Sequence, residues 1–399
     1  MTLQKIDLPH GFKFSGLAAG IKQSMARDLA IFASDENCVA AGVYTQNLVR
    51  AASIDWNRNL TPSDQIRAVV VNSGNANACT GEQGDRDNQQ IATEVAHCLG
   101  TKKEQVLVLS TGIIGHHLPM ERITPGIHKL SSRLRTDELG FEMAAQAILT
   151  TDSSTKTARR QVDQDGSTVQ IAGMAKGAGM IGPQMATLLG VIITNAKLSP
   201  ESAQIAIQSA VDASFNRISV EGHTSTNDAV ILLSNQGTGS VDLGGRLEEF
   251  NNQLTSLCIQ LARLIPVDGE GASHLITIEV VGAKDDIQAD AIARTVANSN
   301  LVKTAVAGGD PNWGRIVSAV GYCPGVELSS DNIDLSINGF ELFKNGSPVE
   351  FDEADVSRSM KAHVETKFSI RVGQGQGEAL HWTSDLTVDY VKFNSEYST

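Results

Sequence analysis

A glycine-rich segment that runs directly into an apolar, β-branched stretch constrains this chain more than any other feature. Its sequence is Lys176-Gly-Ala-Gly-Met-Ile-Gly-Pro-Gln-Met-Ala-Thr187, and Leu188-Leu-Gly-Val-Ile-Ile-Thr194 follows. Closely spaced glycines favour a tight turn, whereas a run rich in Val and Ile is typical of a buried strand. We therefore expect a turn that leads into a central strand, with Ala186 and then Thr187 where the strand begins.

Thr187 is a candidate nucleophile because of where it stands. A buried threonine hydroxyl attacks poorly unless a base lies beside it, and cutting the chain before the threonine frees an α-amine that can be this base. An α-amine has an ordinary pKa of about 7.7–8.0, against about 10.4 for lysine, so it is better matched to neutral pH. If the bond between Ala186 and Thr187 is a self-cleavage site, the segment predicts an acyl-transfer enzyme with an N-terminal threonine.

The same segment supports two other interpretations. Gly177-Ala-Gly-Met-Ile-Gly182 fits the G-x-G-x-x-G fingerprint of dinucleotide-binding domains and follows a strand-like stretch over 167–172. That fingerprint requires a helix after the glycines, but 188–194 suits a strand, and Glu201 meets the acidic position only weakly. The third interpretation is a plain turn with Thr187 as an ordinary strand residue, and taken alone the segment favours it.

Bulk composition bounds the class of protein. The 399 residues are 41% hydrophobic and 19% charged, which is ordinary for a globular chain and leaves room for two or three domains. A formal net charge of −13 argues against nucleic acid or an anionic membrane surface as the main partner. No apolar run approaches the ~18–20 residues of a membrane-spanning helix.

The five cysteines are widely spaced and odd in number, and they form no C-x-x-C pair: Cys38, Cys79, Cys98, Cys258 and Cys323. This pattern argues against a disulfide framework or a zinc site and favours a reducing compartment. The first residues lack both the apolar core of a signal peptide and the Arg/Ser bias of a transit peptide. We therefore expect a cytoplasmic protein.

Strand-like and helix-like segments are mixed along the chain, with no internal repeat or low-complexity stretch. Apolar periodicity predicts helices over 85–99, 119–134, 136–149, 199–215, 247–264 and 285–297. Strands are predicted over 29–33, 38–44, 68–72, 105–110, 229–234, 275–281, 367–372 and 386–393. The order is neither a strict βαβ alternation nor all-β, so it predicts a layered α+β sandwich.

Several motifs of small polar residues follow predicted elements, where loops on a rigid scaffold often place functional groups. Thr111 and Gly112 can point a hydroxyl and a backbone N–H at a developing oxyanion, although a plain strand-end turn is equally consistent. Thr150-Thr-Asp152 is either a ligand-binding cluster or a helix cap. Glu270 stands between two glycines, where it can bind a cationic amine or lie in a surface turn.

Other catalytic patterns find little support. The sequence contains neither G-x-x-x-x-G-K-[ST] nor G-x-S-x-G, which argues against the P-loop and α/β-hydrolase interpretations. The nine histidines form no ligand pattern: His116 and His117 are adjacent, and His274 and His381 are isolated. We therefore expect no metal site.

Together these motifs resemble those of the ornithine acetyltransferase family, the bifunctional glutamate N-acetyltransferases and amino-acid acetyltransferases of arginine biosynthesis. They occur in the family's order and extend over nearly the whole chain. The residues that carry the resemblance are Asn72-Ser-Gly-Asn-Ala-Asn-Ala-Cys-Thr-Gly81, Ser110-Thr-Gly-Ile-Ile-Gly115, Thr150-Thr-Asp152, Lys176-Gly-Ala-Gly-Met180, Ala186-Thr187-Leu188, Thr224-Ser-Thr-Asn-Asp228, Asp268-Gly-Glu-Gly-Ala272, Gly309-Asp-Pro-Asn-Trp-Gly-Arg315 and Asn394-Ser-Glu-Tyr397.

The resemblance implies autoproteolysis between Ala186 and Thr187 into an α chain, 1–186, and a β chain, 187–399, which form one intertwined catalytic unit. It also implies the layered α/β sandwich of the superfamily that includes N-terminal-nucleophile-like aminopeptidases. Thr187 would be the nucleophile with its new amine as the base, and Thr111 and Gly112 would form the oxyanion hole. The residues implied to contact substrate are Thr150, Lys176, Thr187, Glu270, Asn394 and the C-terminal Thr399.

The reaction that the resemblance implies is ping-pong acetyl transfer from N2-acetyl-L-ornithine to L-glutamate through an acetyl-threonine. Lys176 and Asn394 suit the α-carboxylate that both amino acids share, and Glu270 suits the ornithine ammonium. No cofactor is implied, acetyl-CoA is a candidate second donor, and the family suggests two α and two β chains per assembly. The alternative in the same fold is an amidohydrolase or aminopeptidase that uses water as the acceptor.

The chain departs from the family's pattern at a few positions. Gly182 and Gln184 stand where Ala and Asn are expected, and His223 stands where Asp is usual. Ser153-Ser-Thr-Lys156 replaces the commoner Thr-x-Pro-Lys. None of these residues is a proposed catalytic group, so the departures bear on substrate preference and cleavage rate rather than on the reaction class.

Overall fold

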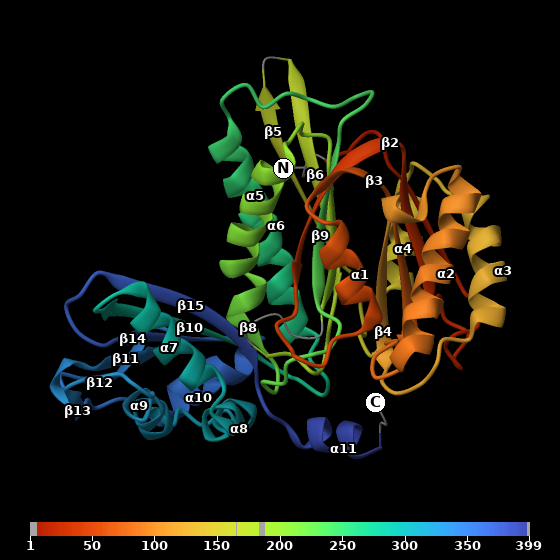
Figure 1. Ribbon diagram of the computed structural model, residues 1–399. Helices are drawn as coiled ribbons and strands as arrows, with labels where there is room; N and C mark the ends of the chain where they lie inside the picture. The colour runs from red at the N-terminus through yellow and green to blue at the C-terminus, as the bar shows by residue number, and fades with distance from the viewer. Residues whose placement is uncertain (1–5, 165, 183–187, 397–399) are drawn as a thin grey trace.

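The computed structural model describes residues 6–164, 166–182 and 188–396 of the chain. The predicted cleavage site, Ala186 and Thr187, and the predicted substrate contact Thr399 lie outside the described residues. Figure 1 shows a large lobe that contains the N-terminal part of the chain and a smaller C-terminal lobe beside it.

The large lobe is organised around a mixed sheet of eight strands. Their order is β4-β3-β2-β9-β7-β6-β5, and β1 pairs with β2 beside this path. The strands are β1 (Lys13–Leu17), β2 (Leu29–Tyr44), β3 (Ser63–Asn75), β4 (Val106–Ile113), β5 (Lys156–Gln164), β6 (Ser167–Lys176), β7 (Leu189–Thr194) and β9 (Ala229–Asn235). The pairs β3–β4 and β7–β9 are parallel, and the other pairs in this sheet are antiparallel.

Strand β2 belongs to both halves of this sheet. Its first residues pair with β1 and β3, whereas residues 38–44 pair with β9. The register with β3 shifts between Ala33 and Cys38. The prediction of two strands separated at 34–37 is therefore wrong, because the polar residues there form an irregularity within one continuous strand rather than a hairpin turn.

Alternation along the strands divides their side chains among three apolar cores and gives the lobe four layers. Leu232 of β9 packs in the core that includes α5 and α6, whereas the next residue along, Leu233, packs with Val69 of β3 in a core between the two halves of the sheet. Val70 of β3 faces the third core, with α2 and α3. The order of layers is helix, sheet, sheet, helix (Figure 1). The structure confirms the predicted layered α+β sandwich.

Five helices of the large lobe, α2 to α6, lie close to the predicted positions, whereas α1 was not predicted. Ser199 caps α5, because its hydroxyl accepts the Ser202 amide at 3.1 Å, and Pro200 stands in the first turn. Fully burying a Leu or Ile side chain on the inner face of such a helix contributes about 1.5–3 kcal/mol. The helices are α1 (Ala52–Leu60), α2 (Gly81–Leu99), α3 (Met120–Ser131), α4 (Glu138–Ala147), α5 (Pro200–Asp212) and α6 (Leu247–Val267).

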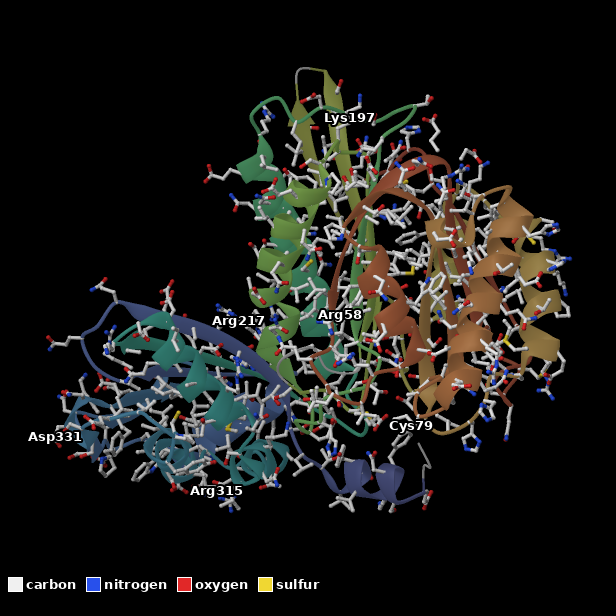
Figure 2. The ribbon with its side chains drawn as sticks, viewed as in Figure 1. Arg58, Cys79, Lys197, Arg217, Arg315 and Asp331 are labelled. Carbon is white, nitrogen blue, oxygen red and sulfur yellow. The ribbon has the colours of Figure 1, made fainter. Side chains whose placement is uncertain are left out.

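The smaller lobe has a seven-stranded sheet with the order β13-β12-β11-β14-β10-β15-β8. Its strands are β8 (Ile218–Ser219), β10 (Leu275–Ala283), β11 (Asp334–Ile337), β12 (Phe340–Lys344), β13 (Ser347–Pro348), β14 (Glu365–Arg371) and β15 (Gly377–Ser384). Its helices are α7 (Asp286–Ala297), α8 (Asn300–Gly308), α9 (Trp313–Gly321) and α10 (Glu353–Ala362). Strand β8 joins the lobes, since Ile218 pairs with Trp382 of β15, and Arg217 directly before it lies at the junction (Figure 2).

The last described element is a helix, α11 (Val388–Glu396), so the strand predicted over 386–393 is wrong. Thr387 caps this helix, because its hydroxyl accepts the Tyr390 amide at 3.2 Å. The alternating apolar residues that suggested a strand do not face a core: Val388 is 70% exposed and Val391 is 60% exposed. Helix α11 lies at one end of the large lobe (Figure 1). Within the described residues, no helix combines the length and the apolar character that crossing a membrane requires.

Candidate active site

A pocket of about 250 Å³ brings together six of the residues predicted for the site. They are Thr111, Gly112, Thr150, Lys176, Glu270 and Asn394. These residues come from β4, the segment before β5, the end of β6, the loop after α6, and α11. Elements that are far apart in the sequence therefore meet at one pocket. The other predicted residues, Ala186, Thr187 and Thr399, lie outside the described residues.

Strand β4 brings Thr111 and Gly112 to the pocket. Gly112 has a φ of +135°, and a Cβ at this position would lie 2.3 Å from the carbonyl carbon of Gly74 on β3. Only glycine fits there without moving the backbone. Thr111 is 2% exposed, so its hydroxyl is held at the pocket wall. A hydroxyl and a backbone N–H from successive residues can together stabilise a developing oxyanion.

Lys176 ends β6, and its buried ammonium has few partners among the residues that the structure describes. Its Nζ lies 3.4 Å from Thr111 Oγ1 and 4.0 Å from Asp152 Oδ2. Burial lowers the pKa of Lys176, and the nearby Asp152 carboxylate opposes this effect. An ammonium has three donors, so Lys176 retains the capacity to bind a carboxylate in the pocket.

The carboxylate of Asp152 binds backbone amides on two segments that line the pocket. Its Oδ1 accepts hydrogen bonds from the Gly177 amide at 2.6 Å and from Lys156 Nζ at 2.8 Å, and its Oδ2 accepts the Thr150 amide at 3.0 Å. Burial would raise the pKa of Asp152, but the Lys176 and Lys156 ammoniums outweigh it and hold the pKa below its usual range. Asp152 therefore positions Thr150 and Lys176, two of the six residues that were predicted to contact substrate.

Lys156 extends this ionic network to the loop after α6. Its side chain is 1% exposed, and its Nζ lies 2.5 Å from Asp268 Oδ2. The Ser153 hydroxyl also donates to Asp268. Breaking a buried pair by removing one partner is strongly destabilising, so this network fixes the loop relative to β5 and β6.

Glu270 lies on that loop and faces the pocket. Its Oε1 accepts the Thr151 hydroxyl at 2.7 Å, and its Oε2 accepts Asn394 Nδ2 at 3.1 Å. Its amide donates to the Ala178 carbonyl at 2.9 Å. A Cβ at Gly179 would lie 2.4 Å from the Glu270 carboxylate, so glycine at 179 makes room for this acidic side chain.

The glycines over 177–182 therefore serve close packing. A Cβ at Gly182 would lie 2.5 Å from the carbonyl carbon of Gly222. The next described element after these glycines is strand β7, where a dinucleotide-binding fingerprint requires a helix. The dinucleotide interpretation of this segment is wrong.

Comparisons with known proteins establish the family. The model of the ArgJ family matches residues 13–399. The arginine biosynthesis bifunctional protein ArgJ of Rhodopirellula baltica is 44% identical over 396 residues, which are 98% of this chain and 96% of that protein. The protein of the same name from Symbiobacterium thermophilum is 43% identical and covers 99% of this chain and 98% of its own length. The chain belongs to the ArgJ family.

A solved structure of an ArgJ protein is also similar to this chain. The bifunctional protein argJ from Bacillus halodurans is 37% identical with a TM-score of 0.49, over 51% of this chain and 96% of that chain. The two full-length matches above are sufficient for the family, and they confirm the identification made from the sequence motifs. No group of three or more His, Cys, Asp or Glu side chains among the described residues of this ArgJ chain could hold a metal ion.

The role of Asp228 was not predicted from the sequence, although its motif carried part of the family resemblance. Its side chain is buried, and Oδ1 accepts the Leu188 amide at 2.9 Å. Burial raises the pKa of Asp228 well above its usual range. Its neighbour Asn227 donates to the carbonyls of Ala76 at 2.6 Å and Ser110 at 2.8 Å. This loop therefore ties the start of β7 to the end of β4.

Glu221 is a second functional candidate that was not predicted. It lines the pocket, and burial raises the pKa of its carboxyl to about 7. His223, which stands where the family usually has Asp, lines the same pocket. The signal in the sequence is weak, because Glu221 stands just before the motif Thr224-Ser-Thr-Asn-Asp228 rather than in it.

Proposed function

We propose that this chain transfers the acetyl group of N2-acetyl-L-ornithine to L-glutamate. Membership of the ArgJ family and relatives named for arginine biosynthesis support the predicted acyltransferase class. The observation that carries the proposal is the convergence of Thr111, Gly112, Lys176 and Glu270 on one pocket. These groups supply an oxyanion site, a cation for a carboxylate and a carboxylate for a cation within a small volume.

The proposed chemistry is a two-step acyl exchange at Thr187. The Thr187 hydroxyl attacks the acetyl carbonyl while its free α-amine takes the hydroxyl proton. Thr111 and Gly112 stabilise the oxyanion, which collapses with loss of the ornithine amine as that amine receives the proton. The amine of glutamate then attacks the acetyl ester, and the threonine hydroxyl leaves with a proton. Each half-reaction breaks one acyl bond and forms another.

The charged groups suit the two amino acids. Lys176 retains the capacity to bind the α-carboxylate that ornithine and glutamate share. Glu270 faces the pocket and suits the ornithine ammonium. Asn394 donates to Glu270, so this amide orients that carboxylate in addition to facing substrate.

Processing, assembly and location belong to the same proposal. A free α-amine at Thr187 requires cleavage after Ala186, which gives the α chain, 1–186, and the β chain, 187–399. The described residues on each side, up to Gly182 and from Leu188, belong to adjacent strands of one sheet or the turn after them, which supports a unit that stays intertwined after the cut. We propose two copies of each chain per assembly, a cytoplasmic location, and acetyl-CoA as a second donor, as the word bifunctional in the relatives' names suggests.

The test is acetyl transfer by purified protein. We expect acetylglutamate and ornithine to form in equal amounts from N-acetylornithine and glutamate, and a Thr187→Ala variant to stay uncut and inactive. The matched control is Thr93→Ala, an exposed threonine on α2, which should leave transfer unchanged. Release of acetate in place of acetylglutamate would support the amidohydrolase alternative, and no reaction of N-acetylornithine with either acceptor would contradict the proposal.

A further inference from the structure

The two substrates of the proposed reaction differ in the charge at the end of the side chain. The ornithine side chain ends in an ammonium, whereas the glutamate side chain ends in a carboxylate. If the chain has the proposed function, on which the role of Glu221 depends, both must occupy the same pocket in turn. Two acidic side chains, Glu221 and Glu270, line the described part of this pocket. Two permanent negative charges would favour ornithine and repel the acceptor.

The two carboxyl groups are held in different ways. Both oxygens of Glu270 accept hydrogen bonds, from Thr151 and from Asn394. Both oxygens of Glu221 are buried, and among the described residues neither meets the distance and angle of a hydrogen bond, although the backbone near His223 and Ile181 is close enough to lower the pKa of this carboxyl. A poorly paired buried carboxyl is costly unless it is protonated or binds a ligand. Glu221 is therefore the group left free to respond to the substrate.

The backbone around Glu221 is fixed. The amides of Val220 and Gly222, on either side, both donate to the Ile181 carbonyl at 2.9 Å. The Val220 carbonyl in turn accepts Lys303 Nζ at 2.7 Å. The position of Glu221 at the pocket is thus set by the bonds of its neighbours rather than by its own carboxyl.

We propose that Glu221 is the group that lets one pocket accept both side chains. As a carboxylate it accepts a hydrogen bond from the ornithine ammonium, and as a neutral carboxylic acid it donates one to the side-chain carboxylate of glutamate. One proton is taken up from water when glutamate replaces ornithine, and the same proton is released when ornithine returns.

The surroundings of Glu221 keep both forms within reach at neutral pH. Burial and, to a smaller extent, the nearby Glu270 raise the pKa of Glu221 to about 7, although the backbone near His223 and Ile181 and the Lys303 ammonium oppose them. The titratable and charged groups that face it come from β6, its own loop, the loop after α6, α8 and α11: Lys176, His223, Glu270, Lys303 and Tyr390. A pKa close to the working pH is what a group that alternates between two forms requires.

The first test needs no variant. Calorimetric titration of processed wild-type protein with glutamate alone, or with ornithine alone, is run near pH 7 in two buffers of different ionisation enthalpy. The apparent enthalpies give the number of protons exchanged. We expect glutamate to bind with proton uptake and ornithine with proton release, so that the two ligands differ by about one proton. The α-amine and α-carboxylate are common to both and cancel in this difference. Equal proton counts for the two ligands would overturn the proposal.

The second test uses Glu221→Gln, which keeps the shape but cannot ionise. For wild type we expect kcat/KM for N-acetylornithine to fall below pH 7 and kcat/KM for glutamate to fall above it. In E221Q the change near pH 7 should disappear from the glutamate profile, and KM for N-acetylornithine should rise about tenfold. An N-acetylated donor with a neutral, isosteric side chain should show a smaller rise.

Two controls separate this proposal from the reaction itself. Glu350→Gln, at an exposed carboxylate of the smaller lobe, should match wild type at every pH. An active E221Q with an unchanged glutamate profile would overturn the role of Glu221 and leave the proposed function standing. Wild-type protein that transfers no acetyl group to glutamate would contradict both.

Discussion

Two lysines in this protein are equally buried but differ in what surrounds the ammonium. Lys176 and Lys303 are each 2% exposed. Lys303, on α8, donates to the Val220 carbonyl at 2.7 Å, to the Thr383 hydroxyl at 2.8 Å and to the Ser384 carbonyl. Lys176 has only Thr111 at 3.4 Å and Asp152 at 4.0 Å among the described residues.

Unused hydrogen-bonding capacity, rather than burial, distinguishes the lysine at the pocket from the lysine at the junction of the lobes. An ammonium has three donors. Lys303 donates to oxygens of β15 and of the loop after β8, so it links the elements at the junction of the two lobes. Lys176 lines the pocket and has few hydrogen-bond partners among the described residues, so it has donors available for the proposed substrate carboxylate. We therefore expect Lys303 to stabilise the fold and Lys176 to bind substrate.

The largest effect that we expect comes from Lys176→Met. The variant removes the cation proposed for the α-carboxylate of both substrates, so kcat/KM should fall about a hundredfold or more for each of them. The midpoint of urea unfolding should stay near the wild-type value, because the lost ammonium had few protein partners. Steady-state kinetics and urea unfolding check both statements. If kcat/KM changed less than threefold, Lys176 would not be a binding group.

Lys303→Met should give the opposite pattern. It leaves the Val220 and Ser384 carbonyls and the Thr383 hydroxyl without their donor, so the free energy of unfolding should fall by about 3 kcal/mol. Its kcat/KM should fall far less than that of Lys176→Met. The measurement is urea unfolding of the two variants side by side. A Lys303→Met protein as stable as wild type would contradict a stabilising role for the hydrogen bonds of Lys303.

The free energy of unfolding should also depend on pH differently in wild type and in Lys303→Met. Burial lowers the pKa of Lys303 from 10.5 to about 7, so the unfolded chain binds a proton between these values that the folded chain does not. The contribution of Lys303 to stability should therefore rise as the pH increases above 7, by at most about 1.4 kcal/mol per pH unit. The stability gap between wild type and Lys303→Met should widen from pH 7 to pH 9. A constant gap would show that the Lys303 ammonium is not destabilised by burial.

We expect the smallest change in the free energy of unfolding from the loss of an exposed ion pair. The ion pair between Arg358 and Asp355 on α10 joins side chains that are 74% and 51% exposed. Water and salt screen such a pair, so Arg358→Ala should change the free energy of unfolding by less than about 0.5 kcal/mol. Urea unfolding against wild type measures the difference. A larger loss would mean that exposed pairs rival the buried lysines in this protein.

Much of the fold follows from periodicity in the sequence. The strands β3 and β9 are predicted correctly because each contains a continuous apolar run, as expected of a strand with an apolar core on both faces, and the capping signal at Ser199 marks the start of α5. Two of the errors have different causes. The polar residues 34–37 stay in one strand because both flanks pair with neighbours, and α11 is a helix whose valines face solvent.

The site was predictable as far as its residues lie in motifs at the ends of strands and helices. Thr111 and Lys176 stand in motifs at the ends of strands and Glu270 stands in a motif after helix α6, and the structure places all three at the pocket. Glu221 and Lys303 could not be found in this way, because what makes them unusual is burial among residues distant in the chain. Lys303 bonds to atoms about eighty positions away on either side, and no local pattern reports such contacts.

The mass of processed protein after incubation with N-acetylornithine, without glutamate, tests the central claim most directly. We expect two fragments under denaturing conditions, with the one that begins at Thr187 heavier by a single acetyl group. Adding glutamate should remove that group and yield acetylglutamate. An intact chain of 399 residues, or fragments that never gain an acetyl group, would contradict an acetyl-threonine mechanism at this pocket.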